Sequence, residues 1–180
     1  IHCLSVVVLC RLLLGLGFLA RVVLWTSLIF AIHPFCIESI TYISGRGDAL
    51  FLLLWLLSFW MFCKGSDGRF WWYIPGWLLF GLSILAKENG LPIPLSMALA
   101  IIFLRKTWRT QQVFAGLMGF LAIIAGFLWF RFAGLPPASK ETLSAIAHAS
   151  LSERLLTLPY MLFTYVQIVL LPHNLHMEYH

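Results

Sequence analysis

Seven apolar segments without a single charged residue set the strongest limit on how this chain folds. Charged residues separate these segments, which cover residues 1–10, 22–37, 49–63, 70–86, 89–104, 110–130 and 155–177. A helix that crosses a bilayer needs about 20 apolar residues, and basic side chains at its ends can extend toward the headgroups. We therefore expect an all-α, polytopic integral membrane bundle of about seven helices, the first of them truncated.

The overall composition agrees with a lipid environment. Hydrophobic residues make up 61% of the chain and charged residues 11%, whereas a soluble domain carries about 25% charged residues. Strands are not expected, because lipid leaves the edge of an open sheet without hydrogen-bond partners. We expect one membrane domain over residues 1–180, and the start at Ile1 suggests an internal piece of a longer protein. The net charge of +5 is explained by membrane topology, so membrane lipid is the expected partner and nucleic acid is not.

The charged residues fall into two groups that alternate along the chain. One group is mainly basic and comprises Arg11, Arg21, Lys64, Asp67, Arg69, Arg105, Lys106 and Arg109. The other is mixed and comprises Glu38, Arg46, Asp48, Lys87, Glu88, Arg131, Lys140, Glu141, Glu153 and Arg154. Basic loops stay in the cytoplasm, so we expect the mixed group to face the periplasm or the lumen of the endoplasmic reticulum. The alternative is that the mixed charges are ordinary solvated loop residues.

The first motif runs from His33 to Asp48 and ends in a Gly-Arg-Gly-Asp sequence. Isoleucine at every third position of residues 37–43 predicts a short helix on the bilayer surface, with Glu38 toward its polar side. The glycines on both sides of Arg46 allow the backbone to come close to a ligand. The alternative is a simple helix-capping loop in which Asp48 is the cap.

The second motif places Lys87 and Glu88 where one apolar segment ends and a proline-rich one begins. In a functional site, Lys87 would meet a phosphate as a point charge. The alternative is a charged turn in which Asn89 and Gly90 supply the bend. The histidines after Pro172 match no strong metal-ligand spacing, so we expect no metal site.

Three stretches together resemble a known family of membrane enzymes. They read HPFCIESITYISGRGDALF, LAKENGLPIPL and RLLTLPYMLFTYVQIVLLPHNLHMEY, in this order. They are similar to the membrane region of the transmembrane and tetratricopeptide-repeat O-mannosyltransferases and their bacterial relatives. The opening resembles the family's HxxN helix with Ser5 in place of Asn. Gly47 stands where Ala or Lys is common, and Glu178 stands where Asp is common.

The resemblance implies a GT-C fold and transfer of a mannose-type sugar from a polyprenyl or dolichyl phosphate to an acceptor hydroxyl. In the eukaryotic members the acceptor is a protein Ser or Thr. The usual catalytic acid lies in a first lumenal loop that would precede Ile1, and tetratricopeptide repeats would follow the chain. We therefore expect these 180 residues to be inactive alone. The location would be the bacterial inner membrane or the endoplasmic reticulum membrane.

The charges of the motifs suit this chemistry. A phosphate leaving group gains negative charge as the sugar–oxygen bond breaks, and a fixed Arg or Lys stabilises it. Arg46 and Lys87 are the candidates for that role. Glu38 is the candidate for a positioning or catalytic carboxylate. The remaining candidates for substrate binding are His33, Asp48 and Glu88.

No cofactor or metal is expected, because the lipid-linked sugar is itself the substrate. Two alternatives remain. A transporter would carry charges inside its spans and show repeated halves. A catalytically inactive scaffold carrying tetratricopeptide repeats would keep the same membrane region.

Overall fold

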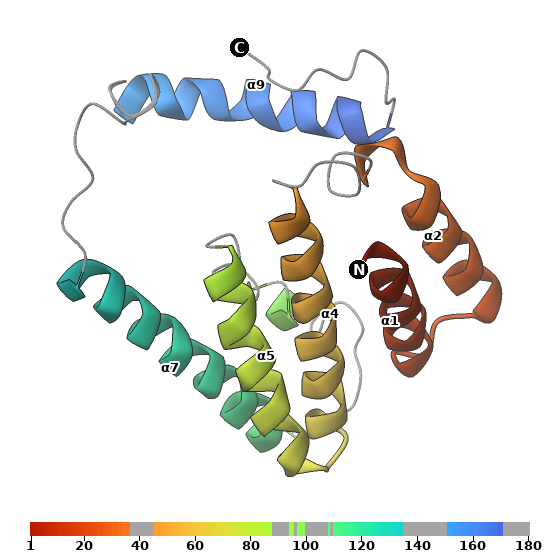
Figure 1. Cartoon of the computed structure of the whole chain (residues 1–180), viewed down its shortest axis with the longest axis vertical. Coiled ribbons are helices and arrows are strands. Elements are labelled where there is room, and N and C mark those ends of the chain that lie inside the picture. The colour runs from red at the N-terminus through yellow and green to blue at the C-terminus, as the bar shows by residue number, and fades with distance from the viewer. Residues whose placement is uncertain are drawn as a thin grey trace. The chain divides into compact units, whose positions relative to one another are not determined.

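The computed structural model describes part of the chain, and every regular element in that part is helical (Figure 1). The described residues are 1–36, 45–87, 94–95, 97–99, 108, 110–134 and 151–170. The α-helices are α1 (His2–Gly15), α2 (Ala20–Ile32), α4 (Arg46–Ser66), α5 (Tyr73–Ala86), α7 (Thr110–Gly134) and α9 (Leu151–Leu170). Two short 3-10 helices are η1 (Pro34–Cys36) and η2 (Phe70–Trp72). The expected all-α class is confirmed for these residues.

Contacts divide the chain into two compact units, Ile1–Arg131 and Phe132–His180. The first unit holds α1, α2, α4, α5 and nearly all of α7. Its buried core is formed mainly by residues of α1, α4, α5 and α7. The second unit holds α9, which contains Pro159 in its interior. Such a proline is tolerated in membrane helices, where other groups satisfy the freed backbone carbonyl. The expected single membrane domain over residues 1–180 stays a prediction.

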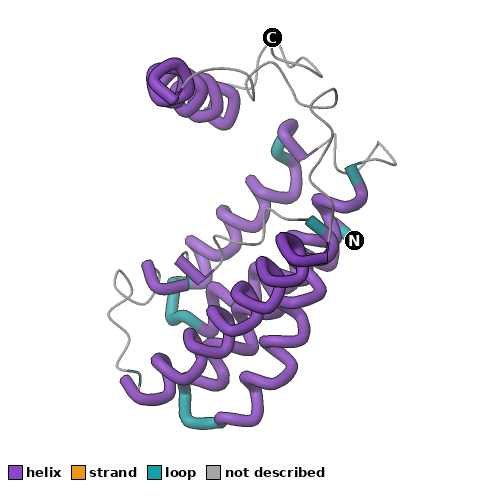
Figure 2. The backbone as a smooth tube through the Cα atoms, turned by 90° about the vertical axis from the view of Figure 1, so that its left-hand side faces the viewer, coloured by secondary structure: helices purple, strands orange, loops and turns teal. Residues whose placement is uncertain are grey.

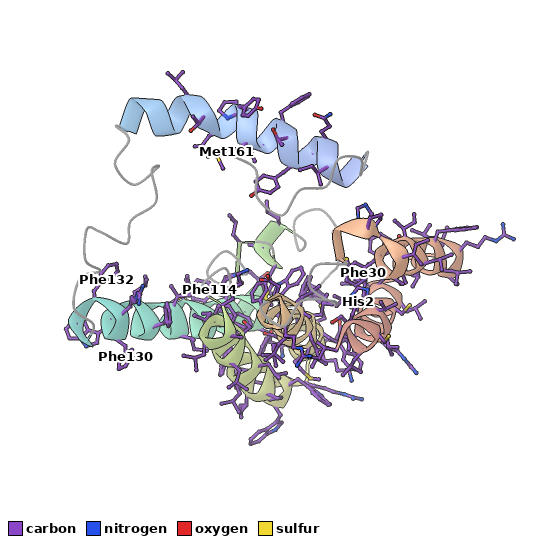
Figure 3. All side chains as sticks on the ribbon, turned by 45° about the horizontal axis from the view of Figure 1, so that its top comes forward. His2, Phe30, Phe114, Phe130, Phe132 and Met161 are labelled. Atoms are coloured by element: carbon purple, nitrogen blue, oxygen red, sulfur yellow. The ribbon has the colours of Figure 1, made fainter. Side chains whose placement is uncertain are left out.

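α1 and α2 form an antiparallel hairpin that is joined by a few polar contacts. The chain turns at Gly17, whose φ of 89° favours glycine. The Nε2 atom of His2 lies 3.3 Å from the carbonyl oxygen of Ala31, and the rings of His2 and Phe30 lie side by side (Figure 3). Further along, the thiol of Cys10 donates to the Ser27 hydroxyl at 2.9 Å. These contacts hold the start of α1 beside the end of α2.

α4 and α5 form the central hairpin of the first unit. The turn contains Gly68, whose φ is 104°. Inside the hairpin, the Ser58 hydroxyl donates to the Gly76 carbonyl at 2.8 Å, and the hydroxyls of Ser66 and Tyr73 lie 3.0 Å apart. Each buried hydroxyl therefore has a partner, as burial away from water requires. Lys64 lies in the last turn of α4 rather than in the connecting loop.

α7 lies against α5 where two glycines of α7, Gly116 and Gly119, face the side chain of Trp77 or its neighbours. The indole nitrogen of Trp77 donates to the Gly116 carbonyl at 3.0 Å, and a Cβ atom added to Gly119 would overlap the same indole ring. Close by, the rings of Phe80 and Phe120 meet edge to face with centroids 4.8 Å apart. Small residues are a common way for membrane helices to approach closely.

Among the described residues, two helices are long and apolar enough to cross a membrane: Arg46–Ser66, with mean hydropathy 1.6, and Thr110–Ala133, with mean hydropathy 2.3. The other described helices are apolar but shorter. Large apolar side chains are exposed on all of them, including Phe114 and Phe130 on α7 (Figure 3). An outward apolar surface is what a lipid-facing helix presents. The expected number of about seven spans stays a prediction.

Candidate functional site

Four of the residues predicted for the site lie at one end of the first unit. Because α4 and α5 are antiparallel, the start of α4 and the end of α5 lie side by side (Figures 1 and 2). Arg46 and Asp48 occupy the first turn of α4, and Lys87 immediately follows α5. His33 ends α2 at the same end of the helices (Figure 1). Two motifs that are well separated in the sequence therefore share one surface.

An ion pair joins the two motifs. The Nζ atom of Lys87 donates to Oδ1 of Asp48, a partner 39 positions earlier in the chain. The two side chains are 41% and 42% exposed, respectively. Lys87 itself is extended, with φ −159° and ψ 133°, and its backbone N–H donates to the Ser83 carbonyl at 3.0 Å. The end of α5 thus holds the ammonium group over the first turn of α4.

The helix dipoles favour this pair. An acidic side chain is stabilised at the N-terminus of a helix and a basic one at the C-terminus. Asp48 is in the first turn of α4, and Lys87 is the C-terminal cap residue of α5. Arg46 is placed differently, because it puts an exposed cation at the N-terminus of α4, where the dipole disfavours positive charge. The stability of α4 therefore gives no reason for an arginine at this position.

The glycine that precedes Asp48 leaves space beside α5. A Cβ atom added to Gly47 would lie 3.9 Å from the Ala86 carbonyl oxygen, which is an ordinary van der Waals contact. The alanine that is common at this position in the family resembled would therefore fit here. Gly47 is not required for the approach of the two helices.

His33 and Cys36 form a compact turn after α2. The backbone N–H of Cys36 donates to the His33 carbonyl at 3.0 Å, and the Cys36 thiol points to the Phe30 carbonyl at 3.8 Å. Burial raises the pKa of the Cys36 thiol, because the thiolate is poorly solvated there. The turn places His33 at the end of the unit that carries the ion pair.

One sequence interpretation is wrong, and the roles predicted for the site residues stay predictions. The alternative in which Asp48 caps α4 is wrong, because Gly45 is the N-terminal cap residue and no side chain caps the helix. Glu38 and Glu88 lie outside the described residues, so their predicted roles stay predictions. Among the described residues, no group of three His, Cys, Asp or Glu side chains is close enough to hold a metal ion.

Sequence reasoning missed the pairing of Asp48 with Lys87. It grouped charges with their neighbours in the chain, whereas the structure pairs a carboxylate of one motif with the ammonium of the other. The alternation of charged groups along the chain was the only available signal. It places both residues on one side of the membrane but does not indicate contact between them.

The described helices are apolar and expose large apolar side chains, two of them are long enough to cross a membrane, and an ion pair joins α4 and α5. These features are those of a helical membrane protein. Residues 1–130 match the family described as dolichyl-phosphate-mannose-protein mannosyltransferase. The chain belongs to this family, which confirms the resemblance that the three motifs indicate.

Relatives among curated proteins agree with this family. The chain is 33% identical over 112 residues to protein O-mannosyl-transferase TMTC2 of Homo sapiens, an alignment covering 57% of the chain and 13% of that protein. It is 32% identical over 81 residues to protein O-mannosyl-transferase TMTC4 of Homo sapiens, covering 41% of the chain and 11% of that protein. The match to TMTC2 of Mus musculus is 34% over 98 residues, covering 49% of the chain and 12% of that protein. The chain thus spans only a small part of these relatives. No solved structure matches it significantly.

Proposed function

We propose that this chain is the donor-binding membrane region of a mannosyltransferase that uses dolichyl or polyprenyl phosphate mannose. The acceptor is a Ser or Thr hydroxyl of a protein. The observation that carries this proposal is the Lys87 ammonium, which the end of α5 holds against a carboxylate at the bundle end where the two motifs meet. Family membership supplies the reaction class.

The proposed chemistry needs positive charge beside the phosphate. The acceptor oxygen attacks the anomeric carbon, the bond from that carbon to the phosphate oxygen breaks, and the phosphate leaves with the electron pair. Lys87 meets the developing anion as a point charge, whereas Arg46 offers a planar fork to two phosphate oxygens. Asp48 accepts a hydrogen bond from Lys87. This contact supports the proposal that Lys87 stabilises an anionic oxygen at this position.

The position of Arg46 supports a functional role. A cation at a helix N-terminus costs about 0.3–1 kcal/mol relative to a neutral residue. An exposed arginine at the start of α4 contributes nothing favourable to the helix dipole. A bound phosphate reverses this, because the helix N-terminus and the guanidinium then face the same anion.

The other predicted residues complete the proposal. Glu38 is the candidate base that takes the proton from the acceptor hydroxyl, or the residue that positions Arg46. His33 lies at the same end of the unit, and we propose His33 and Glu88 as further contacts to the substrate. We expect no metal or cofactor to take part, because basic side chains supply the positive charge beside the phosphate. The protein would lie in the endoplasmic reticulum membrane or the bacterial inner membrane.

The distribution of charge favours this function over transport. A transport path is marked by ionisable residues within the membrane. In α4, α5 and α7, the charged residues lie in the first or last turns, namely Arg46, Asp48, Lys64 and Arg131. The interiors of these three helices are uncharged, which suits a site at the membrane surface.

Mannose transfer by the full-length protein tests the proposal. Transfer from dolichyl phosphate mannose to a Ser/Thr peptide is measured for the parent protein and for Lys87→Gln, normalised to the amount of protein in the membrane. We expect Lys87→Gln to lower the rate about 10²–10³-fold, as when other fixed groups that stabilise developing charge are removed. Unchanged transfer by this variant would overturn the assignment of the site.

Arg21→Gln is the matched control. It also removes one exposed cation, but at the opposite end of the helices, where α2 begins. We expect its transfer rate to equal that of the parent. A parent protein that folds, inserts and transfers no mannose would favour the inactive scaffold instead.

A further inference from the structure

The turn between α4 and α5 carries basic and aromatic side chains at the end of the unit away from Lys87. We call Lys64, Arg69, Phe70 and Trp71 the hairpin surface. The Lys64 ammonium lies between two indole rings, 4.2 Å from the ring centroid of Trp60 and 4.5 Å from that of Trp72. Both distances are within the range of a cation–π contact. The lysine is therefore held at the hairpin and does not extend freely into water.

The aromatic rings of the hairpin surface are open to the surroundings. Trp71 is 80% exposed and Phe70 is 49% exposed, and Arg69 beside them is also exposed. Tryptophan gathers at the headgroup level of membranes, where the apolar ring and the polar N–H both find suitable surroundings. The ends of two apolar helices meet at this turn, so these rings belong at that depth.

Positive charge dominates at this end of the described helices. It carries four cations, Arg11, Arg21, Lys64 and Arg69, against one acid, Asp67, which leaves a net charge of +3. The indole nitrogen of Trp108 donates to Oδ1 of Asp67 at 2.8 Å, so the one carboxylate already has a hydrogen-bond donor. A negatively charged partner would complement the four cations at this end.

We propose that the hairpin surface binds the headgroups of anionic phospholipids and selects them over phosphatidylcholine. A choline headgroup could in principle use its ammonium against indole faces. Here Lys64 already occupies the faces of Trp60 and Trp72, and its charge repels a second cation. A lipid with net negative charge meets Lys64 and Arg69 through its phosphate, while Phe70 and Trp71 lie among the upper acyl chains.

The position of the Phe70 and Trp71 rings favours a lipid over an acidic protein as the partner. A soluble acidic partner would cover the basic groups and leave Phe70 and Trp71 directed at the bilayer. The surface is also separate from the end that holds Lys87 and Asp48. Its lipid selectivity can therefore be present or absent independently of mannose transfer.

Fluorescence quenching of the full chain in lipid vesicles tests this inference. The vesicles contain phosphatidylcholine with an equal share of brominated phosphatidylglycerol or of brominated phosphatidylcholine. The difference in signal between the parent and Trp71→Phe isolates the fluorescence of Trp71. We expect brominated phosphatidylglycerol to quench Trp71 more strongly, and added salt to reduce the difference. Equal quenching by the two lipids in the parent would overturn the proposal, and an acidic protein would then be the partner to seek.

Substitutions of single charged residues test the proposal further. Lys64→Gln and Arg69→Gln should each lower the preference for phosphatidylglycerol about fivefold. Asp67→Asn keeps the Oδ1 atom that accepts from Trp108 and removes the acid, so it should raise the preference. Arg46→Gln, at the other end of α4, should leave the quenching of Trp71 unchanged. A loss of preference in Arg46→Gln as large as in Arg69→Gln would show that net charge, and not the hairpin surface, selects the lipid.

Discussion

Lys87 at the end of α5 pairs with Asp48 in the first turn of α4, across 39 positions of sequence. Both side chains are about two-fifths exposed, and an ion pair of this exposure contributes only about 0–1 kcal/mol to stability. The pair therefore stabilises the contact between α4 and α5 only weakly. Its importance for the proposed function is that it fixes the position of the Lys87 ammonium group.

The first prediction is that breaking the Lys87–Asp48 pair barely changes stability. We expect Lys87→Gln, Asp48→Asn and the double variant to unfold within about 1 kcal/mol of the parent, with a coupling free energy of at most about 1 kcal/mol. Unfolding in a detergent titration measures this. A coupling well above that value would make the pair a structural element and weaken the case for a site.

The second prediction concerns Arg46 in the full-length protein. Arg46→Ala should lose about 10²–10³-fold in mannose transfer. Arg46→Lys should also lose much of the activity, because an ammonium cannot reproduce the planar fork of a guanidinium. Amounts in the membrane should stay near those of the parent, since Arg46 is exposed. Full activity in Arg46→Lys would leave Arg46 as a simple anchor at the membrane surface.

The third prediction concerns the contact between α5 and α7. Gly119→Ala should destabilise the protein by about 1–3 kcal/mol, because the new Cβ would overlap the Trp77 ring. Gly126→Ala, in the same helix but with nothing within 4 Å of its Cβ position, should be neutral or slightly stabilising. Detergent unfolding compares the two variants.

A second change in the same background checks the cause. Trp77→Phe makes the ring smaller, so Gly119→Ala should cost less in that background than in the parent. Equal effects of Gly119→Ala and Gly126→Ala would mean that α7 does not lie on Trp77 as described.

The fourth prediction is the orientation in the membrane. In a protein without other cysteines, Arg69→Cys should react with an impermeant maleimide only from the cytoplasmic side. Arg46→Cys should react only from the opposite side, because Arg46 begins α4, Arg69 lies in the turn after its other end, and the basic group stays inside. Labelling of both positions from one side would contradict this topology.

The fifth prediction concerns the pH dependence of Cys36. Burial raises the pKa of its thiol, so the reactive thiolate forms at higher pH in the folded protein than in the unfolded chain. With Cys36 as the only cysteine, the midpoint of alkylation by iodoacetamide should shift upward relative to the same protein in denaturant. A midpoint at or below the denatured value would contradict the buried turn.

The sequence alone predicted the properties that depend on local chemistry. Runs of apolar residues with charges at their ends require helices in lipid, and the helices α4, α5 and α7 contain the predicted segments 49–63, 70–86 and 110–130 apart from a few terminal residues. Pro34 follows the last residue of α2 and its cap residue His33, because a helix disfavours the residue before proline. The three motifs also identified the family correctly.

Contacts between distant residues depended on the tertiary structure. An apolar segment in lipid shows little difference between its faces, so the sequence does not reveal which side of α4 meets α5 or which side of α7 meets Trp77. If α4 were rotated about its axis, every segment boundary in the sequence would be unchanged, but Asp48 and Lys87 would no longer be in contact. The close approach at Gly116 and Gly119 and the hydroxyl contacts within the α4–α5 hairpin select one rotation, and that choice brings the two motifs together.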